Sequence, residues 1–164
     1  MKKIILSFAL LLCMCVGVSA QAKIIFDGYS DIDIKLKRCY VRANDCIVDV
    51  LITNHTRYDL IINAAVDDGL FRTDLSAYDD EGNVYDKYSI RGNLGDSSFG
   101  GADFSSSSGI TIPKDVSVKL QFKIKNIDEY ATVITSLICN FRGMSNEAYG
   151  KATLQIKNIP ITRE

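Results

Sequence analysis

The sequence predicts an all-β protein built as an antiparallel β-sandwich of about seven to nine strands. Several segments alternate apolar and polar residues with period two, as half-buried strands do. The composition is rich in Val, Ile, Tyr, Phe and Thr, with no Trp and only two Pro. No stretch beyond residue 20 that is long enough for a helix shows a 3.6-residue period. Short strands separated by turn signals indicate two packed sheets.

The first twenty residues have the features of a cleaved signal peptide. Lys2 and Lys3 precede the apolar run Ile4–Val18, and Val18-Ser19-Ala20 is a small-residue cleavage site. We therefore expect residues 1–20 to be removed and the mature protein to be exported and soluble. Its expected location is the periplasm or the cell surface and extracellular space. A lipid anchor is not expected, because neither Cys13 nor Cys15 follows a small residue.

The remaining residues 21–164 are expected to form one domain with a hydrophobic core. Loss of Lys2 and Lys3 changes the formal charge from -1 to -3, and no Lys/Arg cluster stands out along the chain. We therefore expect no nucleic-acid partner. No later segment has the ~20 apolar residues of a membrane helix, so the mature chain is not expected to span a membrane.

Two strands are predicted near the start of the mature chain. Asp31–Leu36 and Cys46–Thr53 both alternate apolar with polar residues. The residues expected to face inward are Ile32, Ile34, Leu36, Val48, Val50 and Ile52.

The middle of the chain predicts a hairpin around an acidic turn. Strand-like runs at Leu70–Tyr78 and Val84–Ile90 flank Asp79-Asp80-Glu81-Gly82-Asn83. Gly82 can supply the positive φ of a hairpin bulge, and Asp side chains bond nearby backbone N–H groups. A calcium site is the weaker interpretation, because consecutive carboxylates diverge and a calcium loop needs spaced ligands. The other acidic pair, Asp67-Asp68, is expected roughly 30 Å away along the strand.

Residues 91–109 show no strand pattern and contain five Gly and six Ser. A loop of this length is uncommon in a compact domain and is usually functional or disordered. Its large apolar residues are Leu94, Phe99 and Phe104. They are expected either to hold the loop against the sandwich or to form a partner-binding surface.

Three strands are predicted in the last third of the chain. Val116–Lys125 alternates most clearly, and Ala131–Phe141 and Ala152–Ile161 follow it. Ile127–Ala131 has room for one helical turn. In the second strand, the residues expected on one face are Val133, Leu137, Cys139 and Phe141. Lys119, Lys123 and Lys125 are expected on the wet face of the first.

Cys39, Cys46 and Cys139 remain after the signal peptide, and an oxidising compartment lets a disulfide persist. A turn at Arg42–Asp45 is expected to bring Cys39 opposite Cys46, provided that a bulge turns both to the same face. The alternative bridge is Cys46 with Cys139, across the two sheets. Either bridge would be structural and leave one free thiol.

Catalytic motifs are incomplete. Gly95-Asp96-Ser97 resembles part of a serine-hydrolase motif, and His55 is the single histidine available to activate Ser97. No second His or Cys pair accompanies His55 to bind zinc. We expect no cofactor and no enzyme activity. Tyr78, Tyr85 and Tyr88 either pack across strands or form an aromatic platform for a sugar.

The order of several short motifs resembles the telokin-like, immunoglobulin-type bacterial exported domains. These landmarks are Thr53-Asn54 at a strand end, Asp79–Tyr85 as a hairpin, Pro113-Lys114-Asp115 before a long amphipathic strand, and a final strand around Ile156–Ile161. The chain lacks the Gly that follows the Pro in that family's turn. The resemblance implies an immunoglobulin-like sandwich and an extracytoplasmic location, with no catalytic residues to carry over.

Taken together, these features predict a non-catalytic binding or accessory module at the cell envelope that recognises a protein or a glycan. A serine hydrolase using Ser97 and His55 and a calcium-dependent adhesive domain are the alternatives. The oligomeric state is open.

Overall fold

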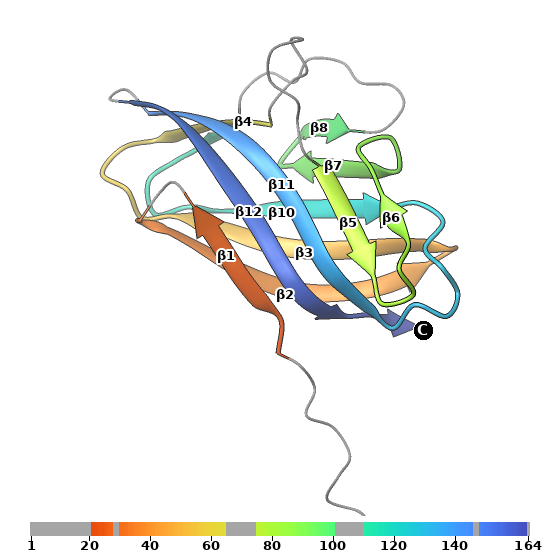
Figure 1. The fold of residues 1–164 in the computed structure, drawn as a ribbon. Coiled ribbons are helices and arrows are strands. Elements are labelled where there is room, and N and C mark those ends of the chain that lie inside the picture. The colour runs from red at the N-terminus through yellow and green to blue at the C-terminus, as the bar shows by residue number, and fades with distance from the viewer. Residues whose placement is uncertain (1–20, 28–29, 65–74, 101–109, 146–147, 164) are drawn as a thin grey trace, which may run out of the picture.

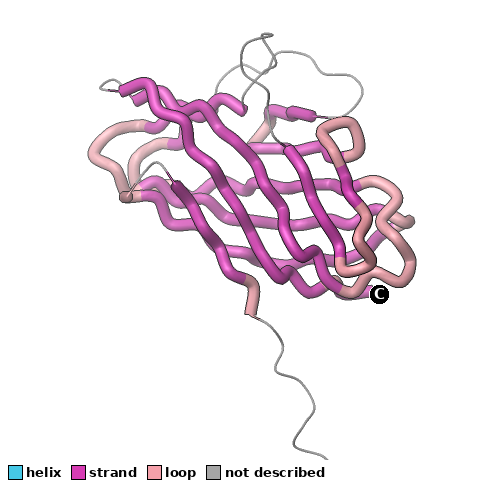
Figure 2. The backbone as a smooth tube through the Cα atoms, viewed as in Figure 1, coloured by secondary structure: helices cyan, strands magenta, loops and turns pink. Residues whose placement is uncertain are grey.

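The computed structural model describes residues 21–27, 30–64, 75–100, 110–145 and 148–163. Within these ranges the chain is an all-β sandwich of two sheets and contains no helix (Figures 1 and 2). The described part therefore has no helix able to cross a membrane. The predicted fold class is confirmed.

One sheet has seven strands in the described residues. Its order is β1-β12-β11-β4-β9, with β5 also paired to β11 and β6 paired to β5. All its pairs are antiparallel. The strands are β1 (Lys23–Asp27), β4 (Leu60–Ala64), β5 (Leu75–Asp79), β6 (Val84–Tyr85), β9 (Ile110–Ile112), β11 (Val133–Ser145) and β12 (Ala148–Pro160).

The other sheet has six strands in the described residues, in the order β13-β2-β3-β10-β7-β8. Its pairs are antiparallel except for the parallel contact between β13 and β2. The strands are β2 (Ile32–Arg42), β3 (Asp45–Asn54), β7 (Ile90–Leu94), β8 (Ser97–Gly100), β10 (Ser117–Ile124) and β13 (Thr162–Arg163).

The core lies between the two sheets, where the alternating residues of β3 and β10 meet those of β11 and β12. Each large apolar side chain buried there contributes roughly 1.5–3 kcal/mol. The central members from the six-stranded sheet are Val48, Val50, Ile52, Leu120, Phe122 and Ile124, all at most 1% exposed. Those from the other sheet include Ile134, Leu137, Cys139, Leu154 and Ile156.

Two β-bulges change which side chains face this core. In β2 the register shifts between Leu36 and Arg38, so Lys37 is the extra residue. In β11 the register against β5 shifts between Ile134 and Ser136, which reverses the alternation there. The expectation that Val133 faces inward is therefore wrong, and Ile134 is buried instead. Period-two patterns cannot locate a bulge, because the extra residue breaks the alternation on which they depend.

Other expectations were corrected in detail. The described strands number thirteen rather than seven to nine. The strands that the sequence patterns did not reveal are five residues long or shorter, too short for clear alternation: β1, β4, β7, β8, β9 and β13. Within the predicted loop 91–109, residues 91–100 form the β7–β8 hairpin, and residues 101–109 lie outside the described residues. The strand predicted at Val84–Ile90 is reduced to β6, Val84–Tyr85, and is followed by a turn at residues 87–89. Residues 127–131 form no helical turn. The predicted strand at Leu70–Tyr78 is described only from Leu75 onward.

Candidate binding site at one end of the sandwich

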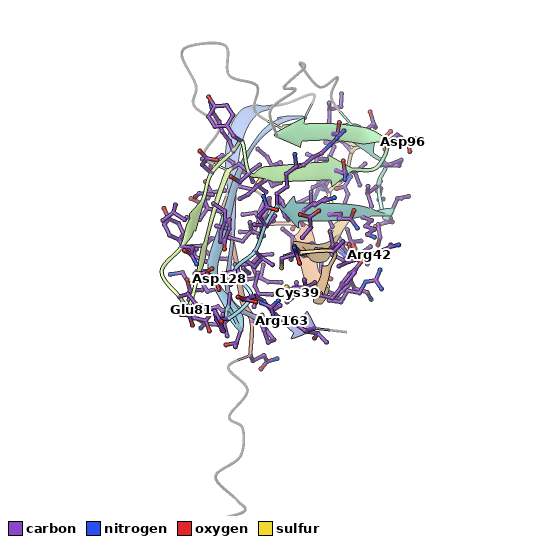
Figure 3. The ribbon with its side chains drawn as sticks, turned by 90° about the vertical axis from the view of Figure 1, so that its right-hand side faces the viewer. Cys39, Arg42, Glu81, Asp96, Asp128 and Arg163 are labelled. Carbon is purple, nitrogen blue, oxygen red and sulfur yellow. The ribbon has the colours of Figure 1, made fainter. Side chains whose placement is uncertain are left out.

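Three connections meet at one end of the sandwich: the β5–β6 turn, the β6–β7 loop and the β10–β11 loop. Figure 3 looks onto this end and labels Glu81 and Asp128 on it, with Arg163 nearby. In Figure 2 these connections are the pink loops on the right-hand side, with the β6–β7 loop uppermost and the other two nearer the C-terminus.

The β5–β6 turn is built around Asp79, which is buried at 4% exposure. Its Oδ1 accepts hydrogen bonds from the N–H groups of Glu81 (3.1 Å) and Asn83 (2.8 Å). Its Oδ2 accepts bonds from Asn83 Nδ2 (3.0 Å) and the Tyr85 hydroxyl (2.8 Å). Gly82 has a φ of 87°, which a glycine adopts without strain. The turn interpretation of this acidic stretch is confirmed.

Tyr85 extends this network to the β10–β11 loop. Its buried hydroxyl donates to Asp79 and accepts a hydrogen bond of 3.1 Å from the Asp128 N–H. Burial alone would raise the pKa of Asp79, but the bonds from Asn83, Tyr85 and the turn amides outweigh it, so that pKa is lowered. Burial raises the pKa of Tyr85 to about 12; the Asp128 amide partly offsets the shift and the Asp79 carboxylate adds to it.

Two residues from other elements bind the β10–β11 loop by hydrogen bonds: Asp80 of the β5–β6 turn and Arg163 of β13. Asp80 accepts hydrogen bonds from the N–H and hydroxyl of Thr132 and from the Val133 N–H. Arg163 Nη2 donates to the carbonyl oxygens of Asp128 (2.6 Å) and Ala131 (2.8 Å).

The β2–β3 turn and the first residue of β3 also accept hydrogen bonds from the β10–β11 loop. The Ile127 N–H donates to the Asn44 carbonyl at 2.9 Å, and the Asn126 N–H donates to Asp45 Oδ1 at 3.3 Å. Four separate elements therefore fix the path of this loop, and the surface that it forms is pre-organised.

Between these connections lies a shallow hollow of about 510 Å³. Amide, hydroxyl, ammonium and carboxylate groups line it: Asn83, Ser89, Lys125, Asn126 and Asp128. Its apolar surface comes from Val84, Tyr85 and Tyr88. We call this the end hollow.

A second hollow of about 350 Å³ adjoins the first and shares Asn126 and Asp128 with it. Tyr130 and Arg163 also line this second hollow. Tyr88 and Tyr130 are 60% and 70% exposed, so an aromatic ring is accessible in each hollow. The Lys87 ammonium lies 5.3 Å from the ring centre of Tyr88, so it occupies one face of that ring. The two hollows therefore offer hydrogen-bond donors and acceptors beside the exposed Tyr130 ring and the remaining exposed surface of Tyr88.

The three tyrosines for which cross-strand packing or a sugar platform was considered have different positions. Tyr85 is buried and structural, whereas Tyr78 and Tyr88 are exposed. Tyr78 lies opposite Val84 on β5 and β6, as expected for cross-strand packing. Sequence reasoning did not find Tyr130, Asn126 or Asp128, because they occupy a loop that carries no motif. The sequence offered one indication of this loop: it directly follows Val116–Lys125, the most clearly alternating predicted strand, which is β10 in the structure.

The two aspartates of the acidic turn are already engaged by hydrogen-bond donors. Both oxygens of Asp79 and both oxygens of Asp80 accept bonds from protein groups. Within the described ranges no group of three or more His, Cys, Asp or Glu side chains is placed to hold a metal ion. Asp67-Asp68, the other acidic pair, lies outside the described residues.

The structure does not bring Ser97 and His55 together. His55 follows the last residue of β3, and Ser97 begins β8, three strands away across the sheet. At about 4.8 Å between neighbouring strands, the two residues are roughly 14 Å apart across the sheet alone. They are also offset along the strands, because register places Ser97 level with Val50 rather than with His55. His55 is exposed, with its Nδ1 3.7 Å from Asp115.

The apolar residues of the predicted loop have different positions. Leu94 is 1% exposed and belongs to the core, so it is not available to a partner. Its burial agrees with the interpretation that it holds this segment against the sandwich. Phe99 lies in β8 opposite Gly92. Phe104 lies outside the described residues.

Cys39 and Cys46 are adjacent but not directly opposite. The turn at Ala43-Asn44 pairs Val41 with Cys46 and Cys39 with Val48, so the expected direct pairing is wrong. The bulge at Lys37 turns Cys39 inward as anticipated, and its Sγ lies 3.4 Å from that of Cys46.

The three cysteines are buried thiols in the structure. The hydrogen bond with Cys46, and then burial, raise the pKa of Cys39, and burial raises the pKa of Cys139. Cys139 lies on β11 of the opposite sheet, opposite Leu154 and Leu75. The proximity of Cys39 to Cys46 favours the local bridge over the bridge to Cys139, and both remain predictions.

No protein-family model, curated protein or solved structure matches this chain. The geometry of the end hollow is therefore the basis for assigning a role to the protein.

Proposed function

We propose that the protein is an exported, non-catalytic binding module of the cell envelope, and that it binds a glycan in the end hollow. The observation that carries this proposal is the combination of exposed Tyr88 and Tyr130 rings with Asn83, Asn126 and Asp128 around two adjoining hollows.

The chemistry of these side chains fits a sugar. Each sugar hydroxyl both donates and accepts hydrogen bonds, so it requires donors and acceptors side by side. The Asn126 amide supplies both, and Lys125 supplies donors. Asn83 and Asp128 supply acceptors, since the Asn83 Nδ2 group already donates to Asp79 and Asp128. A tyrosine ring offers a rigid apolar face for the C–H surface of a pyranose.

The pre-organised loops also favour binding. Ordering a loop or side chain on binding costs free energy, which a surface that is already ordered avoids. Asp79, Asp80 and Arg163 fix the connections around the hollow by hydrogen bonds within the protein. The hollow thus requires little rearrangement to receive a ligand.

The test is a glycan array probed with the mature protein, residues 21–164, followed by calorimetry with the glycan that it retains. The double variant Tyr88→Ala/Tyr130→Ala is expected to weaken binding about tenfold or more, because two stacking surfaces are lost. The matched control is Tyr58→Ala, since Tyr58 is 45% exposed and lies after β3 at the other end of the sandwich.

Loss of affinity in the double variant with an unchanged control supports the proposal. An array that retains no glycan, or equal affinities for both variants, rejects it. Because no reaction is proposed, the bound glycan should be recovered intact after prolonged incubation.

In the same exported context, we propose that Cys39 and Cys46 form a disulfide. Two buried thiols at 3.4 Å need only a small side-chain movement to reach the ~2.05 Å of an S–S bond. Peptide mapping without reductant should recover residues 39 and 46 in linked peptides and Cys139 as a free thiol. A link that includes Cys139 would contradict this pairing.

A further inference from the structure

The outer face of the six-stranded sheet carries an excess of positive charge. We call it the basic face. Seven exposed or half-exposed basic residues belong to it: Lys35, Lys37, Arg38, Arg42, Arg91, Lys119 and Lys123. The carboxylates on the same face are Asp33, Asp45 and Asp49. The face therefore has four more positive than negative charges, although the whole chain has a formal charge of -1.

This clustering exists only in the folded sheet. Register pairs Arg38 with Asp49 across β2 and β3, and Asp49 with Gln121 across β3 and β10. Lys123 in turn lies opposite Arg91 of β7. Four strands from three separate parts of the sequence thus contribute to one face.

Internal contacts hold several of these cations in place. Asp49, only 3% exposed, accepts Arg38 Nε at 2.7 Å and Lys119 Nζ at 3.0 Å. Its third donor, a neutral one, is Gln121 Nε2 at 2.7 Å. The Arg38 guanidinium also lies 4.7 Å from the ring centre of Tyr40. Fixed cations lose less conformational entropy when they bind an anion.

Lys123 and Arg91 are positioned in a similar way. Lys123 Nζ lies 2.7 Å from Asp45, and Arg91 Nη2 donates to Ser98 Oγ at 3.2 Å. Because Ser98 is neutral, its hydrogen bond to Arg91 does not neutralise the positive charge of the guanidinium. Among the described residues, no ion pair is recorded for Lys37, Arg42 or Arg91.

We propose that the basic face binds an anionic polysaccharide, one that carries sulfate or carboxylate groups along its chain. Cations on neighbouring strands present an array of positive charge to such a polymer, and charge complementarity supplies the attraction. This surface is distinct from the end hollow, whose residues it does not include, so neither proposal depends on the other.

The composition of the face disfavours two other anionic partners. Interfacial membrane binding needs apolar side chains to insert, and among the residues whose side chains the structure describes, no exposed large hydrophobic residue lies on β2, β3, β7 or β10. Single-stranded nucleic acid needs aromatic rings for stacking, and Tyr40 is already covered by Arg38. Duplex DNA can bind a basic surface through its phosphates alone, so the test below includes it as an outcome that would overturn the proposal.

The test measures binding of the mature protein to dextran sulfate and to polygalacturonate as a function of salt concentration, with neutral dextran as the blank. The test variant is Lys37→Gln/Arg91→Gln/Lys123→Gln, which leaves the partners of Asp49 in place. We expect its affinity to fall about tenfold and its log–log salt slope to shrink by roughly 2–3, about one per lost contact.

The control is Lys23→Gln/Lys114→Gln/Lys157→Gln, which removes the same charge elsewhere. Lys23 and Lys157 are neighbours on β1 and β12 of the other sheet, and Lys114 precedes β10. Thermal melting of both triple variants confirms that they fold. A test variant that loses affinity while the control keeps it supports the proposal.

Three results would overturn the proposal. The first is no binding of the wild type to either anionic polymer at low salt. The second is an equal loss in both triple variants, which would indicate a response to net charge alone. The third is tighter binding to duplex DNA or to vesicles of mixed zwitterionic and anionic phospholipids, with the same dependence on Lys37, Arg91 and Lys123.

Discussion

Asp49 and Asp79 are two nearly inaccessible carboxylates in different regions of the molecule, and they differ in the charge of their donors. Asp79 lies at the end of β5 and accepts hydrogen bonds from backbone N–H groups, an amide and a phenol, all neutral. Asp49 lies in the middle of β3 and accepts two cationic donors and one neutral amide.

This difference assigns the two residues different roles. Asp79 is bonded within seven residues of its own position and determines the shape of a turn. Asp49 joins β2, β3 and β10 and orients side chains on a surface. The first carboxylate builds the end hollow, and the second builds the basic face. A buried carboxylate can thus serve local backbone order or the arrangement of surface charge, depending on its donors.

Removal of the Asp79 carboxylate should cause the largest loss of stability. We expect Asp79→Ala to lower the free energy of unfolding by about 3 kcal/mol or more, because the turn loses its acceptor and the buried Tyr85 hydroxyl loses a partner. Urea unfolding of the wild type and of Asp79→Asn provides the comparison. Asp79→Asn should cost less, since an amide oxygen still accepts. Equal losses for both variants would show that the charge, rather than the acceptor, matters here.

Removal of the Asp49 charge should cost less and should depend on salt. We expect Asp49→Asn to lower the free energy of unfolding by about 1–2 kcal/mol at low salt. The gap to the wild type should narrow at 1 M salt, because Arg38 and Lys119 are more than half exposed and salt screens their attraction. For Asp79→Asn, the difference in free energy of unfolding from the wild type should be the same at low salt and at 1 M salt. A constant gap for Asp49→Asn would contradict the distinction between the two sites.

The pH dependence of stability should separate the two sites further. The folded pKa of both aspartates is lowered, so the stability that they contribute is present above the unfolded pKa near 3.9 and is lost as pH falls through the lowered pKa. The folded pKa of Tyr85 is raised to about 12, so its contribution is present below pH 10 and is lost between pH 10 and about 12. Melting temperatures of the wild type and Tyr85→Phe, recorded from acid to alkaline pH, measure both losses of stability. Tyr85→Phe should flatten the alkaline limb and leave the acid limb largely in place.

The smallest effect is expected at Gly82. No heavy atom lies within 4 Å of a Cβ built there, so a substitution adds backbone strain without a clash. With φ at 87°, Gly82→Ala should cost about 1 kcal/mol, and Gly82→Asn should cost less because Asn tolerates positive φ better. Chemical denaturation of both variants measures the difference. A loss at Gly82→Ala as large as that of Asp79→Ala would mean that the glycine, and not the carboxylate, determines the turn.

The amino-acid sequence by itself determined the fold class and the local turn chemistry. Alternation in β3 and β10 identified the inner faces correctly, since a period of two depends only on neighbouring residues in one strand. Asp79 and Gly82 were recognised as a turn for the same reason. The Thr53-Asn54 landmark also has a local basis, because buried Asn54 bonds Thr56 and Tyr58 just after the strand.

Only the tertiary structure decided where the bulges fall, which strands are neighbours and which surfaces result. Lys37 and Thr135 become extra residues because packing of the two sheets selects the register on each side of them. The end hollow and the basic face combine residues that lie far apart in the chain, such as Asn83 with Asp128 and Arg38 with Lys119. Their juxtaposition depends on strand order, and strand order is a property of long-range packing that no local pattern encodes.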